Sequence, residues 1–356
     1  MRHLLLSSLF IFISCLPKES NSSLGLKFLA QTSIPYETTL DQAPVGGLSG
    51  MIKLQDEAYL AISDDRSELA PARMIKLKIS FKNGELKVLP LSNVTLKKDS
   101  KPFAFNEIDT EAIARLGQDV LIASEGSYRK GQRHAPFIRR FDLEGNQLSE
   151  IPLDSKFIPQ ASGEITRGVR SNKGFESLAT TADGKLIFAA TETALIQDAK
   201  DDLQRHNLVR ILRIEADSFK TQEFAIKLDH IQVDGAGGVL TGDNGLSDIL
   251  VLNENELLLL ERAWVKKIKR QIIRLYYINL KGATDVSHLS ALDEKTPLVV
   301  KSLVMDFDQL GITLDNSEIL SFGPELDGKK TLIVGSDNNF SKKQMNQFLL
   351  FEILPK

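Results

Sequence analysis

Carboxylate side chains recur at matching places along this chain, and they could act together only if the fold gathers them. Five segments share one pattern: a polar or acidic residue opens a short apolar run, a turn follows, and a second apolar run ends in Asp or Glu. The opening residues are Ser49, Glu111, Glu176, Asp248 and Glu318, and the closing residues are Asp64, Glu125, Glu192, Glu261 and Asp337. The pattern returns about every 67 residues, which indicates an internal repeat.

Gathered carboxylates need partners, because like charges repel and buried charges resist the loss of water. Ca²⁺ suits such a set, since it is a hard ion that takes oxygen ligands from Asp, Glu and Asn. The candidate ligands are Asp64, Asp109, Glu125, Glu318, Asp337 and Asn338. The five histidines are scattered without the spacing of a zinc site. A simpler interpretation stays open, in which acids at strand ends cap turns or pair with arginines on a hydrated rim.

Strands must position these residues, because long amphipathic helical patterns are almost absent and short apolar runs are bounded by Gly, Asn, Asp and Pro. Four antiparallel strands per repeat, arranged radially, make a β-propeller. We predict an all-β propeller with five blades; six is the alternative if 154–170 or 229–244 contain further strands. The fifth repeat lacks a strand, so residues 25–34 should close the last blade. The opening and closing residues should then meet at one mouth of the channel.

The first residues predict export. An apolar stretch over residues 4–13 follows a basic start and is too short to span a bilayer, which is typical of a signal peptide. It ends at Cys15, the single cysteine, and resembles a bacterial lipoprotein signal in which that cysteine takes the lipid. We predict a signal peptide over 1–14, a polar tether over 15–23 and one propeller domain over 24–356. An ordinary signal peptide with an incidental cysteine is the alternative.

The charge balance limits the partners. The formal net charge is −3, so no basic surface predicts binding to nucleic acid. Contact with a membrane is expected only through a lipid anchor, in the periplasm or cell envelope. The basic stretch "WVKKIKRQ" (264–271) is interpreted as a solvated hairpin loop rather than a contact patch.

These segments resemble the bacterial phytase-like family, known as the "esterase-like activity of phytase" domain. The resemblance covers roughly residues 45–355, and its most specific motifs are "NKGFE" and "SDNNF". The matching stretches, in family order, are "GGLSGM" (46–51) with "ISDDR" (62–66), "DTEAIA" (109–114) with "SEG" (124–126), "NKGFESLA" (172–179) with "TET" (191–193), "LLLER" (258–262), and "NSEIL" (316–320) with "SDNNF" (336–340). The departures are Asp248, where an acidic residue is less regular, and Ile319, where the family often has glycine.

The resemblance implies a β-propeller that hydrolyses phosphate or other esters, with calcium as the implied cofactor. The expected substrate is a small anionic or ester molecule. The catalytic candidates are Glu111, Glu176, Glu192 and Glu261, and the candidates for binding an anionic substrate are Arg66, Lys173 and Arg262. A serine route is not favoured, because no G-x-S-x-G motif is present.

Two other functions stay open. A glycosidase would use a pair of carboxylates, but the chain has a single tryptophan for stacking against sugars. A non-catalytic propeller on the cell surface, with the acids holding a structural ion, belongs to a different class. Turnover that a chelator abolishes would distinguish the hydrolase from the binding protein.

Overall fold

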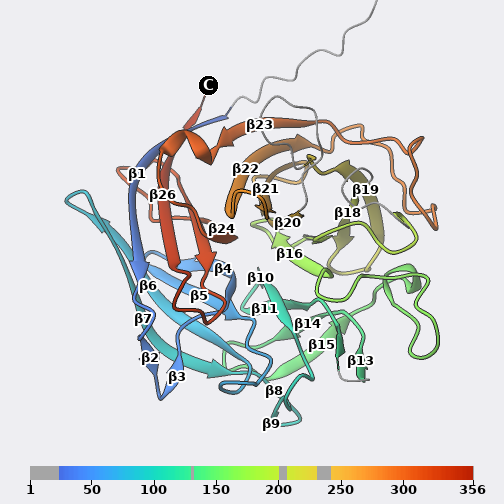
Figure 1. The fold of residues 1–356 in the computed structure, drawn as a ribbon, viewed down its shortest axis with the longest axis horizontal. Helices are drawn as coiled ribbons and strands as arrows, with labels where there is room; N and C mark the ends of the chain where they lie inside the picture. Colours follow the sequence, from blue (N-terminus) through green and yellow to red (C-terminus); the bar gives the residue numbers. More distant parts are fainter. Residues whose placement is uncertain (1–23, 130–131, 200–206, 231–241, 356) are drawn as a thin grey trace, which may run out of the picture.

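The computed structural model describes residues 24–129, 132–199, 207–230 and 242–355, so the predicted signal peptide, the tether and Cys15 lie outside the described residues. Five four-stranded antiparallel sheets are arranged radially around a central channel (Figure 1). The prediction of a five-bladed β-propeller is confirmed. Within the described residues no helix has the length and apolar character needed to cross a membrane.

Each of the first four blades is built from strands that follow one another along the chain, from the channel outward. Blade one contains β4 (Leu48–Gln55), β5 (Ala58–Ser63), β6 (Arg73–Lys82) and β7 (Glu85–Thr95). Blade two contains β10 (Thr110–Leu116), β11 (Asp119–Ser124), β14 (Phe137–Phe141) and β15 (Gln147–Ile151). Blade three contains β16 (Phe175–Thr180), β17 (Leu186–Thr191), β18 (Leu208–Glu215) and β19 (Thr221–Lys227). Blade four contains β20 (Gly242–Val251), β21 (Glu256–Val265), β22 (Arg270–Asn279) and β23 (Lys301–Asp306).

Both ends of the described chain meet in the fifth blade. This blade contains β24 (Asn316–Phe322), β25 (Thr331–Asp337), β26 (Asn346–Pro355) and, as its outer strand, β1 (Leu24–Ile34). The antiparallel pairing runs from Leu24 opposite Pro355 to Ile34 opposite Asn346. The N-terminal strand therefore closes the last blade, as predicted, and covers the edge that β26 would otherwise expose.

Short strand pairs and 3₁₀ turns lie outside the five four-stranded sheets. They are the strand pairs β2 (Thr39–Leu40) with β3 (Ala43–Pro44), β8 (Lys97–Lys98) with β9 (Lys101–Pro102) and β12 (Ser127–Arg129) with β13 (Gln132–His134), and the 3₁₀ turns η1 (Ser155–Phe157) and η2 (Phe307–Leu310).

The apolar core lies between the blades, with one cluster of buried side chains at each of the five junctions. Blade four shows why the second strands are continuously apolar. Leu257 and Leu259 pack against blade three, whereas Leu258 and Leu260 pack against blade five. Because side chains alternate along a strand, a strand that is buried on both faces must be apolar at every position.

A β-bulge interrupts the first strand of every blade near its start. A bulge places one extra residue opposite a single partner and re-aims its side chain. The bulged residues are Ser49, Glu111, Glu176, Ser247 and Glu318. Four of the five predicted opening residues are therefore equivalent in three dimensions, and the exception lies in blade four.

Candidate functional site

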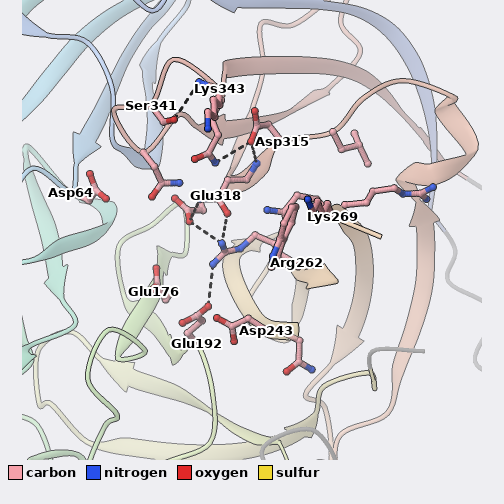
Figure 2. A pocket seen from close by; sticks show the side chains of 18 of the residues that line it. Asp64, Glu176, Glu192, Asp243, Arg262, Lys269, Asp315, Glu318, Ser341 and Lys343 are labelled. Carbon is pink, nitrogen blue, oxygen red and sulfur yellow. Dashed lines mark hydrogen bonds and ion pairs between the residues drawn. The ribbon is translucent and has the colours of Figure 1, made fainter. Parts of the chain in front are cut away.

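A cavity of about 1130 Å³ opens at the end of the channel where the first strands begin and the second strands end. Five carboxylates of the predicted opening and closing residues line it from four blades, although they are far apart along the chain (Figure 2 labels all but Glu111). They belong to Asp64, Glu111, Glu176, Glu192 and Glu318. The radial arrangement thus gathers most of the recurring acids at one mouth, as the repeat predicts.

A buried triad of Asp109, Glu111 and Glu125 adjoins the cavity, and of these three residues only Glu111 lines it. One carboxylate oxygen of each lies within 4.8 Å of the others, and the three residues are 1%, 6% and 0% exposed. One cation contacts them: Arg66 Nε lies 2.5 Å from Asp109 Oδ2, and Arg66 Nη2 lies 3.8 Å from Glu125 Oε1. Asp109 Oδ1 and Glu125 Oε1 are buried and accept no hydrogen bond from the described residues. The triad is therefore under-neutralised.

Burial and mutual repulsion act on these acids together. Loss of hydration raises the pKa of Glu111 well above its usual value, and the charges of Glu176, Asp109 and Glu125 raise it further. Burial and then Asp109 raise the pKa of Glu125, although a hydrogen bond from the Gly174 N–H opposes the shift. The site consequently favours either protons or a bound cation over bare carboxylates.

Glu176 stands apart from the triad on the cavity wall. It is the bulged residue of β16, and its side chain points into the cavity (Figure 2). Among the described residues neither a hydrogen bond nor an ion pair to its carboxylate is found. Burial raises the pKa of Glu176 well above its usual range, and the charges of Glu192 and Glu125 add to the shift. Burial therefore favours the protonated form of Glu176 at the cavity wall.

Two cations, Arg262 and Lys173, pair with other acids that line the cavity. Arg262 Nη2 lies 3.1 Å from Glu192 Oε1, and Arg262 Nη1 lies 3.4 Å from Glu318 Oε1, so the guanidinium joins blades three and five (Figure 2). Lys173 Nζ lies 3.2 Å from Glu192 Oε2 and 2.6 Å from Asp243 Oδ2. Burial alone would lower the pKa of Arg262, but Glu318 and Glu192 raise it, so this cation keeps its charge.

Burial and several neighbouring charges shift the pKa values of Asp64 and Glu318. Burial, followed by the charge of Asp109, raises the pKa of Asp64 to about 6. Burial also raises the pKa of Glu318 to about 7, with Arg262 opposing the shift and Asp64 adding to it. Asp64 Oδ1 is a further buried oxygen that accepts no hydrogen bond from the described residues.

Asp337 and Asn338 lie behind the cavity wall and tie the last blade to the first. Asp337 Oδ1 accepts the N–H of Leu48 at 3.0 Å, and Asn338 Oδ1 accepts the N–H of Gly47 at 3.3 Å. Both residues are buried, and neither lines the cavity. Their positions match the repeat, but their oxygens already serve the backbone. Their predicted role as metal ligands is untested and stays a prediction.

Blade four departs from the expected alignment by one residue. Leu246 pairs with Glu261, so Arg262 occupies the place that Asp64, Glu125 and Glu192 hold in the first three blades. The expectation that Glu261 faces the channel mouth is wrong, because a shift of one residue turns a strand side chain to the other face. Glu261 instead pairs with Lys301 and accepts the N–H of Asp229 at 3.1 Å.

Asp248 is displaced for the same reason, because the bulge falls on Ser247. Its Oδ2 accepts the N–H of Leu320 at 2.7 Å, and its Oδ1 accepts the N–H of Ile249 at 2.8 Å. The carboxylate is buried, which raises its pKa well above the usual value. Asp248 therefore fastens blade four to blade five and takes no part in the cavity.

Glycines make room for the acids. A Cβ on Gly174 would lie 2.2 Å from the backbone oxygen of Glu125, and a Cβ on Gly245 would lie 2.4 Å from Glu192 Cγ. Both distances are far below any real Cβ contact, so only glycine lets these carboxylates approach the next blade.

Sequence reasoning missed some lining residues. Asp243, Lys269 and Lys343 all line the cavity. Asp243 precedes the bulged Ser247 by four residues, just as Asn172 precedes Glu176. This equivalence of Asp243 and Asn172 becomes visible only when Ser247 of blade four is aligned with Glu176 of blade three. Lys269 and Lys343 lie in turns that the repeat pattern does not describe.

Comparison with models of protein families matches residues 43–340 to the phytase-like family, described as "esterase-like activity of phytase". The chain belongs to the phytase-like family. The resemblance found in the motifs is thereby confirmed over most of the chain.

This phytase-like protein is also similar to a protein named "Uncharacterized secreted protein" from Arthroderma benhamiae, with 21% identity over 173 residues. That match covers 41% of this chain and 33% of the fungal protein, so the chain spans about a third of its curated relative. Among solved structures, an endo-arabinase from Bacteroides thetaiotaomicron has 12% identity and a TM-score of 0.45, with 91% of this chain and 96% of that chain covered. An α-L-arabinanase from Penicillium chrysogenum has 10% identity and a TM-score of 0.39, with 88% and 80% covered.

The donor set of the phytase-like protein fits a hard cation. The triad could hold a metal ion, since three carboxylates converge and two of their buried oxygens accept no hydrogen bond from the described residues. Among the described residues that line the cavity there is no histidine or cysteine, which suits an oxygen-preferring ion better than zinc.

Proposed function

We propose that this phytase-like protein hydrolyses phosphate or other esters at the mouth of the propeller, with Ca²⁺ as its cofactor. The observation that carries the proposal is the buried triad of Asp109, Glu111 and Glu125, which reaches through Glu111 the open cavity that the uncommitted carboxylate of Glu176 also lines. Family membership supports ester chemistry but does not prove it, because function resides in the site and not in the fold.

Asp109, Glu111 and Glu125 would hold the cation, with Asp64 beside them. Bound there, a divalent ion neutralises the acids, polarises a phosphoryl or acyl oxygen and promotes ionisation of water. Arg66 already holds Asp109 and orients the triad. Glu318, Asp337 and Asn338 are the remaining predicted ligands, and their hydrogen bonds suggest that they support the wall instead.

We assign substrate binding and proton transfer to the remaining side chains. Lys173 and Arg262 carry charge on the cavity wall and would bind the anionic group of the substrate. Glu192 holds both cations in place. Glu176 would take a proton from the attacking water while the oxygen of that water forms a bond to phosphorus or to the acyl carbon. The bond to the leaving alcohol then breaks, and the alcohol takes a proton from the water that fills the open cavity.

Export is part of the proposal. The N-terminal residues have the pattern of a signal peptide, and the fungal relative is named a secreted protein. Attachment of lipid at Cys15 would hold the protein in the periplasm or cell envelope, and mass spectrometry of the protein from membranes tests it. An unmodified Cys15 in the mature protein would refute the anchor.

The experiment is an assay of the purified protein with p-nitrophenyl phosphate and p-nitrophenyl acetate, first with Ca²⁺ and then with chelator. We expect turnover that the chelator abolishes and that Glu176→Gln reduces by about a hundredfold. Glu261→Gln is the matched control, because Glu261 is an equally buried acid outside the cavity. Melting that depends on Ca²⁺ without turnover of either ester would instead support a non-catalytic binding propeller.

A further inference from the structure

A band of lysines surrounds part of the cavity mouth. The turn between β21 and β22 carries Lys266, Lys267 and Lys269, and the turn between β25 and β26 carries Lys342 and Lys343. We call these five residues the lysine rim. Lys269 and Lys343 line the same cavity, one from each turn (Figure 2). Two turns that are about 70 residues apart in sequence are thus joined at the mouth, as expected for adjacent blades of one repeat.

The lysine rim forms no ion pair among the described residues, although Lys342 Nζ lies 5.9 Å from the centroid of the Tyr36 ring. All five side chains are exposed, and the ion pairs found among the described residues include none of them. Two acids that line the same cavity have other partners: Asp308 pairs with Arg270, and Asp315 accepts the N–H of Met345 at 2.8 Å. The rim therefore presents exposed positive charges that no ion pair of the described residues neutralises, on a chain whose formal net charge is −3.

Large apolar side chains are exposed between these lysines. Trp264 is 37% exposed, Ile268 is 42% exposed and Met345 is 40% exposed, and all three lie on the two turns or at their bases. Binding of small soluble anions requires the lysine charges but does not require exposed apolar side chains. Lysines with an exposed tryptophan and isoleucine are what a surface needs to reach the headgroup region of a bilayer and insert into its edge.

We propose that the lysine rim, with Trp264, Ile268 and Met345, docks on an anionic bilayer. Each lysine near such a surface strengthens binding by roughly fivefold, so five of them suffice for reversible docking. Docking would bring the cavity mouth against the lipid headgroups. The docking itself does not depend on hydrolysis; the consequence that esters carried by the bilayer are the substrates rests on the proposed function.

The test is binding to vesicles of phosphatidylcholine alone and of phosphatidylcholine with phosphatidylglycerol. All proteins begin at Leu16, so that neither the apolar stretch predicted as a signal peptide nor an acyl chain on Cys15 contributes to binding. The variant K266E/K267E/K269E should lose at least about tenfold in partitioning onto the anionic vesicles. The matched control K185E/K281E/K330E changes the charge equally on exposed turns at the opposite ends of the sheets and should bind like the parent.

Trp264 gives a second readout, because it is the single tryptophan of the chain. Its emission should shift to shorter wavelength with anionic vesicles, and the shift should weaken as salt rises. Equal binding to both kinds of vesicle, unchanged binding of the rim variant, or a parent that binds a soluble acidic polysaccharide but no vesicle would each overturn the proposal. Ester turnover is not used, so failure of docking is distinct from failure of the proposed hydrolase.

Discussion

Arg262 is the residue whose replacement tests the electrostatics of the cavity most directly. The change Arg262→Met keeps the length of the side chain and removes its charge from between Glu192 and Glu318, which lie 3.1 and 3.4 Å away. Breaking a buried ion pair leaves an uncompensated charge and costs roughly 3 to 5 kcal/mol. The side chain of Arg262 is 19% exposed, so we expect a loss of about 3 kcal/mol, at the lower end of that range.

The assay is urea unfolding at low ionic strength with chelator, at about pH 8, where both acids are ionised in the unfolded chain. The control is Arg140→Met, which removes an arginine that is 42% exposed and pairs with Asp119 at 2.5 Å. It should cost less than about 1 kcal/mol. At lower pH the deficit of Arg262→Met should shrink, because a protonated carboxyl needs no cation. Equal losses for the two variants at about pH 8 would show that the cavity is hydrated like open surface, and the reasoning would fail.

Three further outcomes are expected. With chelator present, stability should fall between about pH 5 and pH 8, because Asp64 and Glu318 have folded pKa values of about 6 and 7, above their unfolded values, so the folded state binds more protons; a melting temperature that rises over this range would contradict it. Glu111→Gln should weaken Ca²⁺ binding at least about tenfold by calorimetry yet raise the melting temperature without metal, because a like charge leaves the buried triad; unchanged affinity would remove Glu111 from the ligand set. Asp248→Ala should cost about 2 kcal/mol in urea, because the N–H groups of Leu320 and Ile249 lose their acceptor, with turnover unchanged; lost turnover in the folded variant would return Asp248 to the site.

The repeat made most of the site predictable without coordinates. Strands with alternating or continuously apolar residues, turns at regular spacing and an incomplete last repeat lead to five blades closed by residues 25–34. The positions of Glu111, Glu176, Glu192 and Glu318 follow, because equivalent positions of radial blades must share one end of the channel. The catalytic roles predicted for Glu111, Glu176 and Glu192 and the metal-binding role predicted for Glu318 stay proposals.

The predicted alignment of blade four is wrong by one residue, because in its sequence an acidic residue stands next to each of the two equivalent positions. In "GLSDILVLNENELLLLER" the acids Asp248 and Glu261 fit the repeat pattern, while Ser247 and Arg262 occupy the equivalent places in space. Only hydrogen-bond register, which depends on where the bulge falls, decides between the two. The result is an arginine in the ring of acids.

The amino-acid sequence alone therefore determined the class of fold, its closure and the kind of side chains that the mouth would hold, since these depend on local patterns repeated along the chain. Tertiary structure decided which acids have cations, which serve the backbone and which remain uncommitted. Those distinctions depend on contacts between blades, where Arg262 meets Glu192 and Glu318 and where two distant turns place Lys269 beside the same cavity as Lys343. The sequence pattern within one repeat does not encode the distance between side chains of two different repeats.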